Sequence, residues 1–162
     1  MDAVKPGGGM DKPTIRPARP GEGRALEALQ RRASASDPAF ARVLAEIPEA
    51  IVVPVEWIAG GRVFVAERGG AVVGFAVVLE HGESIELEGL FVEPEAWRGG
   101  AGRALVARAA EVATAAGAAF LDVIGNPNAR EFYEACGFEL LGEKSLRFGT
   151  GLVMRLPLRR QP

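Results

Sequence analysis

Seven stretches of this chain carry the short apolar or alternating pattern that is typical of β-strands. They are residues 14–17, 63–67, 71–79, 84–92, 120–124, 139–147 and 152–158. The second and third stretches flank Arg68-Gly69-Gly70, and this short glycine-containing connection predicts a hairpin. Two glycines within residues 149–151 are expected to separate the last two strands.

Helical patterns fill the intervals before the hairpin. Residues 20–35 predict one helix and residues 37–46 predict a second. The second opens with Asp37 as its N-cap and Pro38 at its first helical position. Residues 55–58 are expected to form a single helical turn within a segment that prolines interrupt.

Two further helices are predicted in the second half of the chain. Residues 100–116 place five apolar residues on one face, at Leu105, Ala109, Val112, Ala113 and Ala116. Gly117 is expected to end this helix. A last helix is expected from Asn128, its N-cap, to Cys136. The order β-α-α-β-β-β-α-β-α-β-β predicts an α/β (α+β) fold, with a mixed, mostly antiparallel central sheet of about seven strands and about four helices.

Composition narrows the class of protein. With 162 residues, 48% of them hydrophobic and 25% charged, the chain has the size and composition of one globular domain. We expect a disordered tail in residues 1–13 and a single domain in residues 14–158. The net charge of −2 argues against nucleic-acid binding, and no apolar run has membrane-spanning length. One cysteine and no apolar signal core favour a cytoplasmic location.

The most informative segment connects the strand at residues 84–92 to the helix that follows. Gly99, Gly100 and Gly102 fall where that helix begins. Glycine lets a ligand lie directly on the backbone, and the first N–H groups of a helix lack internal partners and carry the positive end of its dipole. The segment therefore predicts a seat for a phosphate or pyrophosphate.

Two well-known phosphate loops do not fit this segment. A P-loop requires Lys followed by Ser or Thr after its last glycine, whereas Arg103 and Ala104 follow Gly102. A dinucleotide fingerprint requires a third glycine where Leu105 stands. A plain glycine-rich turn without a ligand is the remaining alternative at this point.

Two segments together resemble the GNAT family of acetyl-coenzyme A-dependent N-acetyltransferases. Residues 86–106 are similar to motif A of that family and residues 126–138 to its motif B, and the predicted element order agrees with it over about residues 14–158. One position departs from the family loop, because Trp97 stands where Gln or Arg is usual and the arginine follows at Arg98. The resemblance implies an acyl-CoA N-acyltransferase-like fold and an N-acetyltransferase.

The resemblance also implies where the cosubstrate, acetyl-CoA, binds. Its pyrophosphate is expected on Arg98, Gly99, Gly100, Ala101, Gly102 and Arg103. Its pantetheine arm is expected on the backbone of Leu90, Phe91 and Val92, with the Phe91 amide as oxyanion donor. Other cofactor contacts are expected from Asn126, Asn128, Phe132 and Tyr133. If the strand at residues 84–92 is fully paired with the next strand, the arm has no free edge to bind.

Acyl transfer to an amine requires a base for the ammonium and a donor for the oxyanion, and it is helped by an acid for the leaving thiolate. Glu86 and Glu88 are the candidate bases. Because side chains alternate along a strand, we expect both on one face together with Val92, and Leu87 and Phe91 on the other face. Simple solvent exposure of both carboxylates is the alternative.

Tyr133 is the only tyrosine of the chain. The resemblance implies that it protonates the departing thiolate, and packing beside Phe132 is the alternative. Cys136 is best interpreted as a small packing residue rather than a nucleophile paired with His81. No cluster of metal-ligating residues accompanies His81 in the sequence, so no metal is expected.

Together these features predict an enzyme that moves an acetyl group from acetyl-CoA to an amine of a small molecule or peptide, by direct attack in a ternary complex. The alternatives are a coenzyme A-binding regulatory module without turnover and a transferase for a longer acyl group. The acidic pair favours a cationic acceptor, whose identity the sequence does not specify. A homodimer is compatible with the resemblance, and neither nucleic acid nor membrane is an expected partner.

Overall fold

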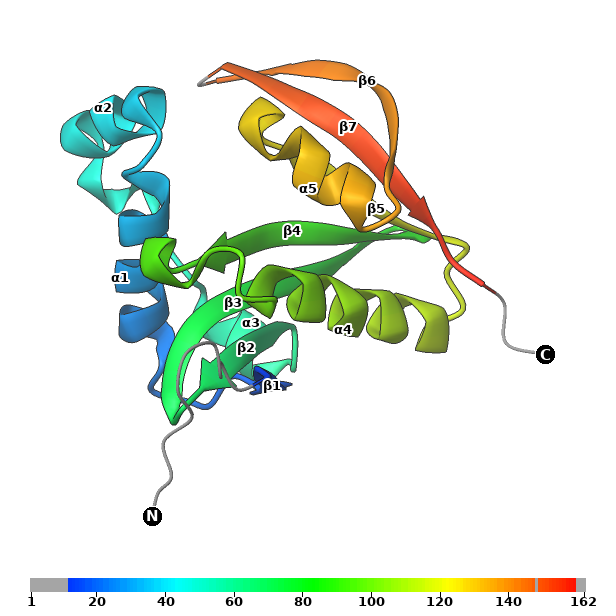
Figure 1. Ribbon diagram of the computed structural model, residues 1–162, viewed down its shortest axis with the longest axis horizontal. Coiled ribbons are helices and arrows are strands. Elements are labelled where there is room, and N and C mark those ends of the chain that lie inside the picture. The colour runs from blue at the N-terminus through cyan, green and yellow to red at the C-terminus, as the bar shows by residue number, and fades with distance from the viewer. Residues whose placement is uncertain (1–11, 148, 160–162) are drawn as a thin grey trace.

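A computed structural model describes residues 12–147 and 149–159 of the chain, so residues 1–11 of the expected tail lie outside it. One seven-stranded sheet has the order β1-β2-β3-β4-β5-β7-β6 (Figure 1). The strands are β1 (Thr14–Pro17), β2 (Val63–Arg68), β3 (Ala71–His81), β4 (Ser84–Val92), β5 (Phe120–Gly125), β6 (Glu139–Leu146) and β7 (Gly149–Pro157). The predicted α/β fold and the predicted order of strands and main helices along the chain are confirmed, and β4 has the predicted bounds.

The described part of the chain contains five α-helices, one more than the approximate count expected from the sequence. They are α1 (Gly23–Ser34), α2 (Pro38–Glu46), α3 (Val55–Ala59), α4 (Ala101–Ala115) and α5 (Arg130–Ala135). Three short 3₁₀ turns complete the chain, η1 (Pro48–Ala50), η2 (Pro94–Ala96) and η3 (Pro127–Ala129). No helix among the described residues is both long enough and apolar enough to span a membrane.

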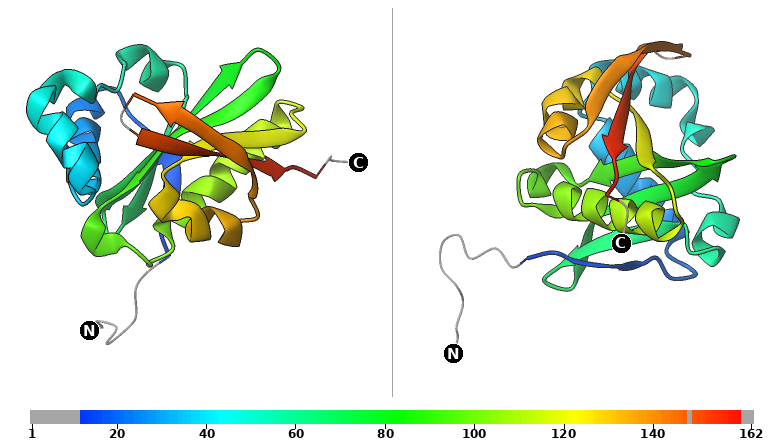
Figure 2. Two further views of the ribbon diagram at one scale, coloured as in Figure 1. Left: turned by 90° about the horizontal axis from the view of Figure 1, so that it is seen from above. Right: turned by 90° about the vertical axis from the view of Figure 1, so that its right-hand side faces the viewer.

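Helices cover both faces of the sheet, and each face has its own apolar core. On one face α4 buries Leu105 and Ala109, and α5 buries Tyr133, against the sheet. On the other face Leu26 of α1 and Ile58 of α3 pack on the apolar residues of β2 and β3. Figure 2 shows α4 and α5 on the opposite side of the sheet from α1.

The sheet opens along one edge of β4. The pairs β1–β2, β2–β3, β3–β4, β5–β7 and β6–β7 are antiparallel, and only β4 and β5 run parallel. The parallel pairing covers Ile85 to Leu87, whereas β4 stays paired with β3 as far as Val92. The second half of β4 therefore has a neighbour on one side only, and β5 with β7 separates from it (Figure 1).

A β-bulge in β4 corrects the predicted alternation of its side chains. The register with β3 pairs Leu87 with Val78 and Gly89 with Val77, which leaves Glu88 as the extra residue. Because the extra residue inverts the parity, Leu87 and Val92 contact the core beneath α4, while Phe91 contacts the core beneath α1. The expectation that Leu87 and Phe91 share a face opposite Val92 was wrong.

Two smaller expectations also need correction. The last helix was expected to start at an Asn128 cap, but η3 precedes α5, and it is Asn126 whose side chain caps η3 by accepting from the Asn128 N–H at 2.8 Å. Residues 149–151 were expected to separate the last two strands, but Gly149 already pairs with Leu146, so these residues belong to β7.

Candidate active site

The glycine turn between β4 and α4 contains three glycines, and each lies in a different physical environment. Gly100 has a φ of 91°, which an L side chain rarely adopts, and it is the N-cap of α4. A Cβ on Gly102 would lie 3.1 Å from the Phe132 ring, so Phe132 of α5 packs directly on the start of α4. A Cβ on Gly99 would lie 2.6 Å from the Arg68 guanidinium.

The start of α4 has the properties of an anion seat. The first hydrogen bond beyond the cap runs from the Ala104 N–H to the Gly100 carbonyl at 3.0 Å. The N–H groups of Ala101, Gly102 and Arg103 precede it and have no partner within the helix. No acidic residue lies in the first turn of α4, so the positive end of its dipole is not neutralised there.

The departure from the family loop has a structural explanation at Trp97. Its indole Nε1 donates to the carbonyl oxygen of Val92 at 2.9 Å, so the ring turns back to the end of β4. Arg98, the next residue, has a φ of 69°, which is unusual for a residue other than glycine. The loop backbone thus takes an unusual conformation at two positions, Arg98 and Gly100.

The open half of β4 offers backbone groups to a ligand. In an antiparallel pair, successive residues direct their N–H and C=O groups alternately to one neighbour and to the other. The Glu93 N–H donates to Val73 of β3 at 2.8 Å, so the groups of Phe91 also face β3. Those of Leu90 and Val92 then face the side from which β5 has diverged.

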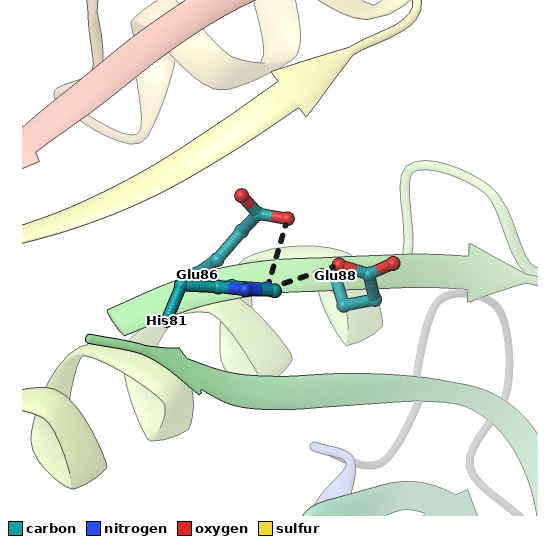
Figure 3. Close-up of side chains that lie close together, drawn as sticks. All are labelled: His81, Glu86 and Glu88. Carbon is teal, nitrogen blue, oxygen red and sulfur yellow. Dashed lines mark ion pairs between the residues drawn. The ribbon is translucent and has the colours of Figure 1, made fainter. Parts of the chain in front are cut away.

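Two carboxylates and an imidazole converge beside this edge. The Nε2 atom of His81 lies 3.7 Å from a carboxylate oxygen of Glu86 and 3.7 Å from one of Glu88 (Figure 3). One possible metal-ligating atom of each of the three residues lies within 4.8 Å of the other two, so the expectation that no cluster of metal-ligating residues accompanies His81 was wrong. The sequence predicted the carboxylate pair but did not predict that His81 joins it.

Glu86 has the environment of a general base that works near neutral pH. Burial, the hydrogen bond and charge of Glu88 and the charge of Asp122 raise the pKa of Glu86, His81 lowers it, and the net result is a pKa of about 7. A carboxylate with this pKa is ionised in about half of the molecules at pH 7 and can take up and release a proton there.

A charged row crosses the sheet next to Glu86. Glu86 is in register with Asp122 of β5, and Asp122 with Arg155 of β7. Arg155 Nε donates to Asp122 at 2.7 Å, and its guanidinium lies 4.4 Å from the centre of the Phe120 ring. This ion pair was not predicted from the sequence, where its only trace is one charged residue in each of two otherwise apolar strands.

Tyr133 is a core residue at the place where β5 ends. Its side chain is 6% exposed, and its ring packs edge-on against Phe132 and Phe138 with centroids 5.2 and 5.3 Å away. A Cβ on Gly125, the last residue of β5, would lie 2.9 Å from this ring. Burial raises the pKa of the Tyr133 phenol well above its usual range, so it stays protonated at neutral pH.

The remaining candidates take these positions. The Asn126 amide donates to Asp37 at 3.1 Å as well as capping η3, so it links α2 to the end of β5. Cys136 is half-buried beside the α4 core, and burial raises the pKa of its thiol, which favours the unreactive form. His81 lies with Glu86 and Glu88, which supports packing as the role of Cys136.

The comparisons with known proteins agree with this geometry. The model of the Acetyltransferase (GNAT) family matches residues 27–138, more than half of the chain. The chain therefore belongs to the GNAT family and is an acyltransferase. No curated protein matches the chain.

Solved structures of N-acetyltransferases resemble it over nearly their whole length. A ribosomal-protein-alanine N-acetyltransferase from Brucella melitensis is 28% identical, covers 90% of this chain and 99% of its own, and has a TM-score of 0.69. A nourseothricin acetyltransferase is 25% identical, with 92% and 100% coverage and a TM-score of 0.68. The Paia N-acetyltransferase of Thermoplasma acidophilum in complex with coenzyme A is 15% identical, with 91% and 99% coverage and a TM-score of 0.72.

Proposed function

We propose that this protein transfers an acetyl group from acetyl-CoA to the amine of a cationic small molecule or peptide, by direct attack in a ternary complex. One observation carries the proposal. The open edge of β4 begins at the bulge residue Glu88, next to Glu86, and a short connection through η2 joins its end to the start of α4, where backbone N–H groups are unpaired within the helix. One continuous segment, from β4 to the start of α4, can therefore supply the base and contact both the thioester and the phosphates of acetyl-CoA.

The residues present fit coenzyme A. The pyrophosphate carries negative charge and would accept from the N–H groups of Ala101, Gly102 and Arg103. The two amides of the pantetheine arm would pair with Leu90 and Val92 as an added strand does. The alternation of backbone groups makes Leu90 a better oxyanion donor than Phe91, because the groups of Phe91 face β3.

The acceptor amine must lose a proton before it attacks the thioester carbonyl. Glu86 suits this step better than Glu88, because burial and its charged neighbours bring its pKa to about 7, while Glu88 is the exposed bulge residue. Glu88 adds a second carboxylate beside Glu86, which favours a protonated, cationic acceptor before the reaction.

The thiolate of coenzyme A leaves as the tetrahedral adduct collapses. Tyr133 is the candidate to stabilise it, since its ring lies at the end of β5 next to the open side of the sheet. Because the pKa of this phenol is raised, the phenol is a weak acid but keeps a hydrogen to donate. We expect it to act mainly by a hydrogen bond to the sulfur.

Isothermal titration with coenzyme A, followed by a thiol-release assay, tests the proposal. The acceptor panel should contain peptide N-termini and cationic amines such as nourseothricin, because the similar structures include enzymes named for each. We expect binding, and release that requires an amine. Absence of binding at high micromolar coenzyme A would refute the proposal, and tight binding without release for any amine would support a regulatory module instead.

A further inference from the structure

Arg68 contacts the phosphate loop from a distant part of the chain. It is the last residue of β2, and its guanidinium Nη2 donates to the carbonyl oxygen of Gly99. A Cβ on Gly99 would lie 2.6 Å from Nη1 and 3.0 Å from Nη2 of the same guanidinium. A side chain at residue 99 would therefore displace the Arg68 guanidinium from the loop backbone.

This contact sets the direction of the next amide. In a trans peptide the C=O and N–H groups point to opposite sides of the bond. The described residues contain no cis peptide bond, so fixing the Gly99 carbonyl on Arg68 directs the Gly100 N–H away from the hairpin. Gly100 is the N-cap of α4, directly before the unpaired N–H groups of its first turn.

We propose that Arg68 is a positioning residue for the pyrophosphate of coenzyme A. By holding the Gly99 carbonyl it orients the Gly100 N–H, and its positive charge lies at the loop that receives the two phosphates. This inference rests on the proposed function. It also fits the family departure, because the Trp97 indole is turned to Val92, and Arg68 contacts the loop from the β2–β3 hairpin instead.

The first experiment compares two acyl donors in the R68Q variant. S-acetylpantetheine lacks the pyrophosphate, so an effect that acts through the phosphate loop must vanish with it. We expect the KM for acetyl-CoA to rise about 10-fold, as for loss of one charge-assisted hydrogen bond, with kcat nearly unchanged. We expect no change with S-acetylpantetheine. An equal loss with both donors, or no loss with either, would overturn the proposal.

The matched control is R62Q. Arg62 directly precedes β2, at its opposite end, and pairs with Glu80 in an exposed ion pair of 3.2 Å. The R62Q substitution removes the same charge from the protein as R68Q does, at a site away from the glycine turn. The kinetics with acetyl-CoA should therefore stay as in the wild type. If R62Q raises the KM as much as R68Q, net charge explains the effect and the positioning role of Arg68 is refuted.

A double-mutant cycle gives a second, independent test through coenzyme A affinity measured by titration. As a single substitution, G99A should weaken binding, because its Cβ displaces the Arg68 guanidinium from the loop. In the R68A background there is no guanidinium to displace, so R68A/G99A should bind no more weakly than R68A. Losses that simply add would overturn the proposal. If the wild type itself fails to bind coenzyme A, the proposed function and this inference both fail, whereas Arg68 variants that bind normally refute the inference alone.

Discussion

A single carboxylate, Glu86, connects the chemistry of the site to its stability. Its surroundings raise its pKa to about 7, well above the ordinary glutamate value of 4.5. The folded protein therefore favours the protonated form of Glu86 more than the unfolded chain does. This is unfavourable for folding at neutral pH but useful for a base, which must release the proton again after each turnover.

We expect E86Q to lose about 10²-fold or more in kcat, because glutamine cannot accept the proton of the ammonium. In the wild type, kcat/KM should rise with pH through about 7, since Glu86 must be ionised to act. Because His81 lowers the pKa of Glu86, H81Q should move this limb to higher pH. Rates of the wild type, E86Q and H81Q measured from pH 5 to 9 check these three expectations. If the rise of kcat/KM with pH is not shifted in H81Q, Glu86 is not the group whose ionisation causes it.

The same pKa predicts an effect on stability. The folded protein holds a proton on Glu86 between pH 4.5 and about 7 that the unfolded chain has released, so stability falls as pH rises through this range. E86Q should not show this loss. Its free energy of unfolding should exceed that of the wild type by on the order of 1–3 kcal/mol at pH 8 and should equal it at pH 4. Denaturant unfolding at both pH values measures it. E111Q, at an exposed helical ion pair, is the control and should show no such change.

Tyr133 gives the third prediction at the scale of single residues. Y133F keeps the ring that packs on Phe132 and Phe138 but removes the hydroxyl. We expect kcat to fall on the order of 10²-fold while the affinity for coenzyme A stays constant. An acetyl thioester of a more acidic thiol needs less help to leave, so it should show a smaller loss. An equal loss with both thioesters would assign Tyr133 to packing.

At the scale of elements, local patterns predicted the sequence of helices and strands but not the contacts between them. The bounds of β4 followed from its alternation and the glycine before it. The bulge at Glu88 did not, because it depends on the register with β3. The early end of β4–β5 pairing, the Asp122–Arg155 ion pair and the Arg68–Gly99 contact likewise join residues far apart in the chain.

Two glycines with the same kind of backbone conformation flank α4, so a substitution at one end can be compared with the same substitution at the other. Gly100 at its start has a φ of 91° and Gly117 after its end has a φ of 85°, and a Cβ would meet nothing within 4 Å at either. G100A and G117A should therefore each destabilise the protein by about 1 kcal/mol through backbone strain. Only G100A should raise the KM for acetyl-CoA. Equal kinetic effects from both variants would mean that the start of α4 is not the phosphate seat.

At the scale of the whole molecule, the sheet consists of two parts joined by a short parallel pairing of β4 with β5, which we call the seam. β1 to β4 form one part and β5 to β7 the other, and they pair only through Ile85, Glu86 and Leu87 with β5. The candidate base lies on the seam, and the open edge of β4 begins next to it. A ligand that binds along this edge therefore supplies contacts that the sheet itself lacks.

Coenzyme A should consequently stabilise the whole protein rather than one loop. At 100 times its Kd it adds about 2.7 kcal/mol, which for a domain of this size raises Tm by roughly 5–10 °C. Hydrogen exchange should slow at Leu90 and Val92 as well as at Ala101, Gly102 and Arg103, because the arm and the pyrophosphate bind different elements. Pantetheine alone should protect only the β4 amides, and 3′,5′-ADP should leave Leu90 unprotected. Protection confined to the start of α4 with intact coenzyme A would show that the open edge of β4 does not bind the arm.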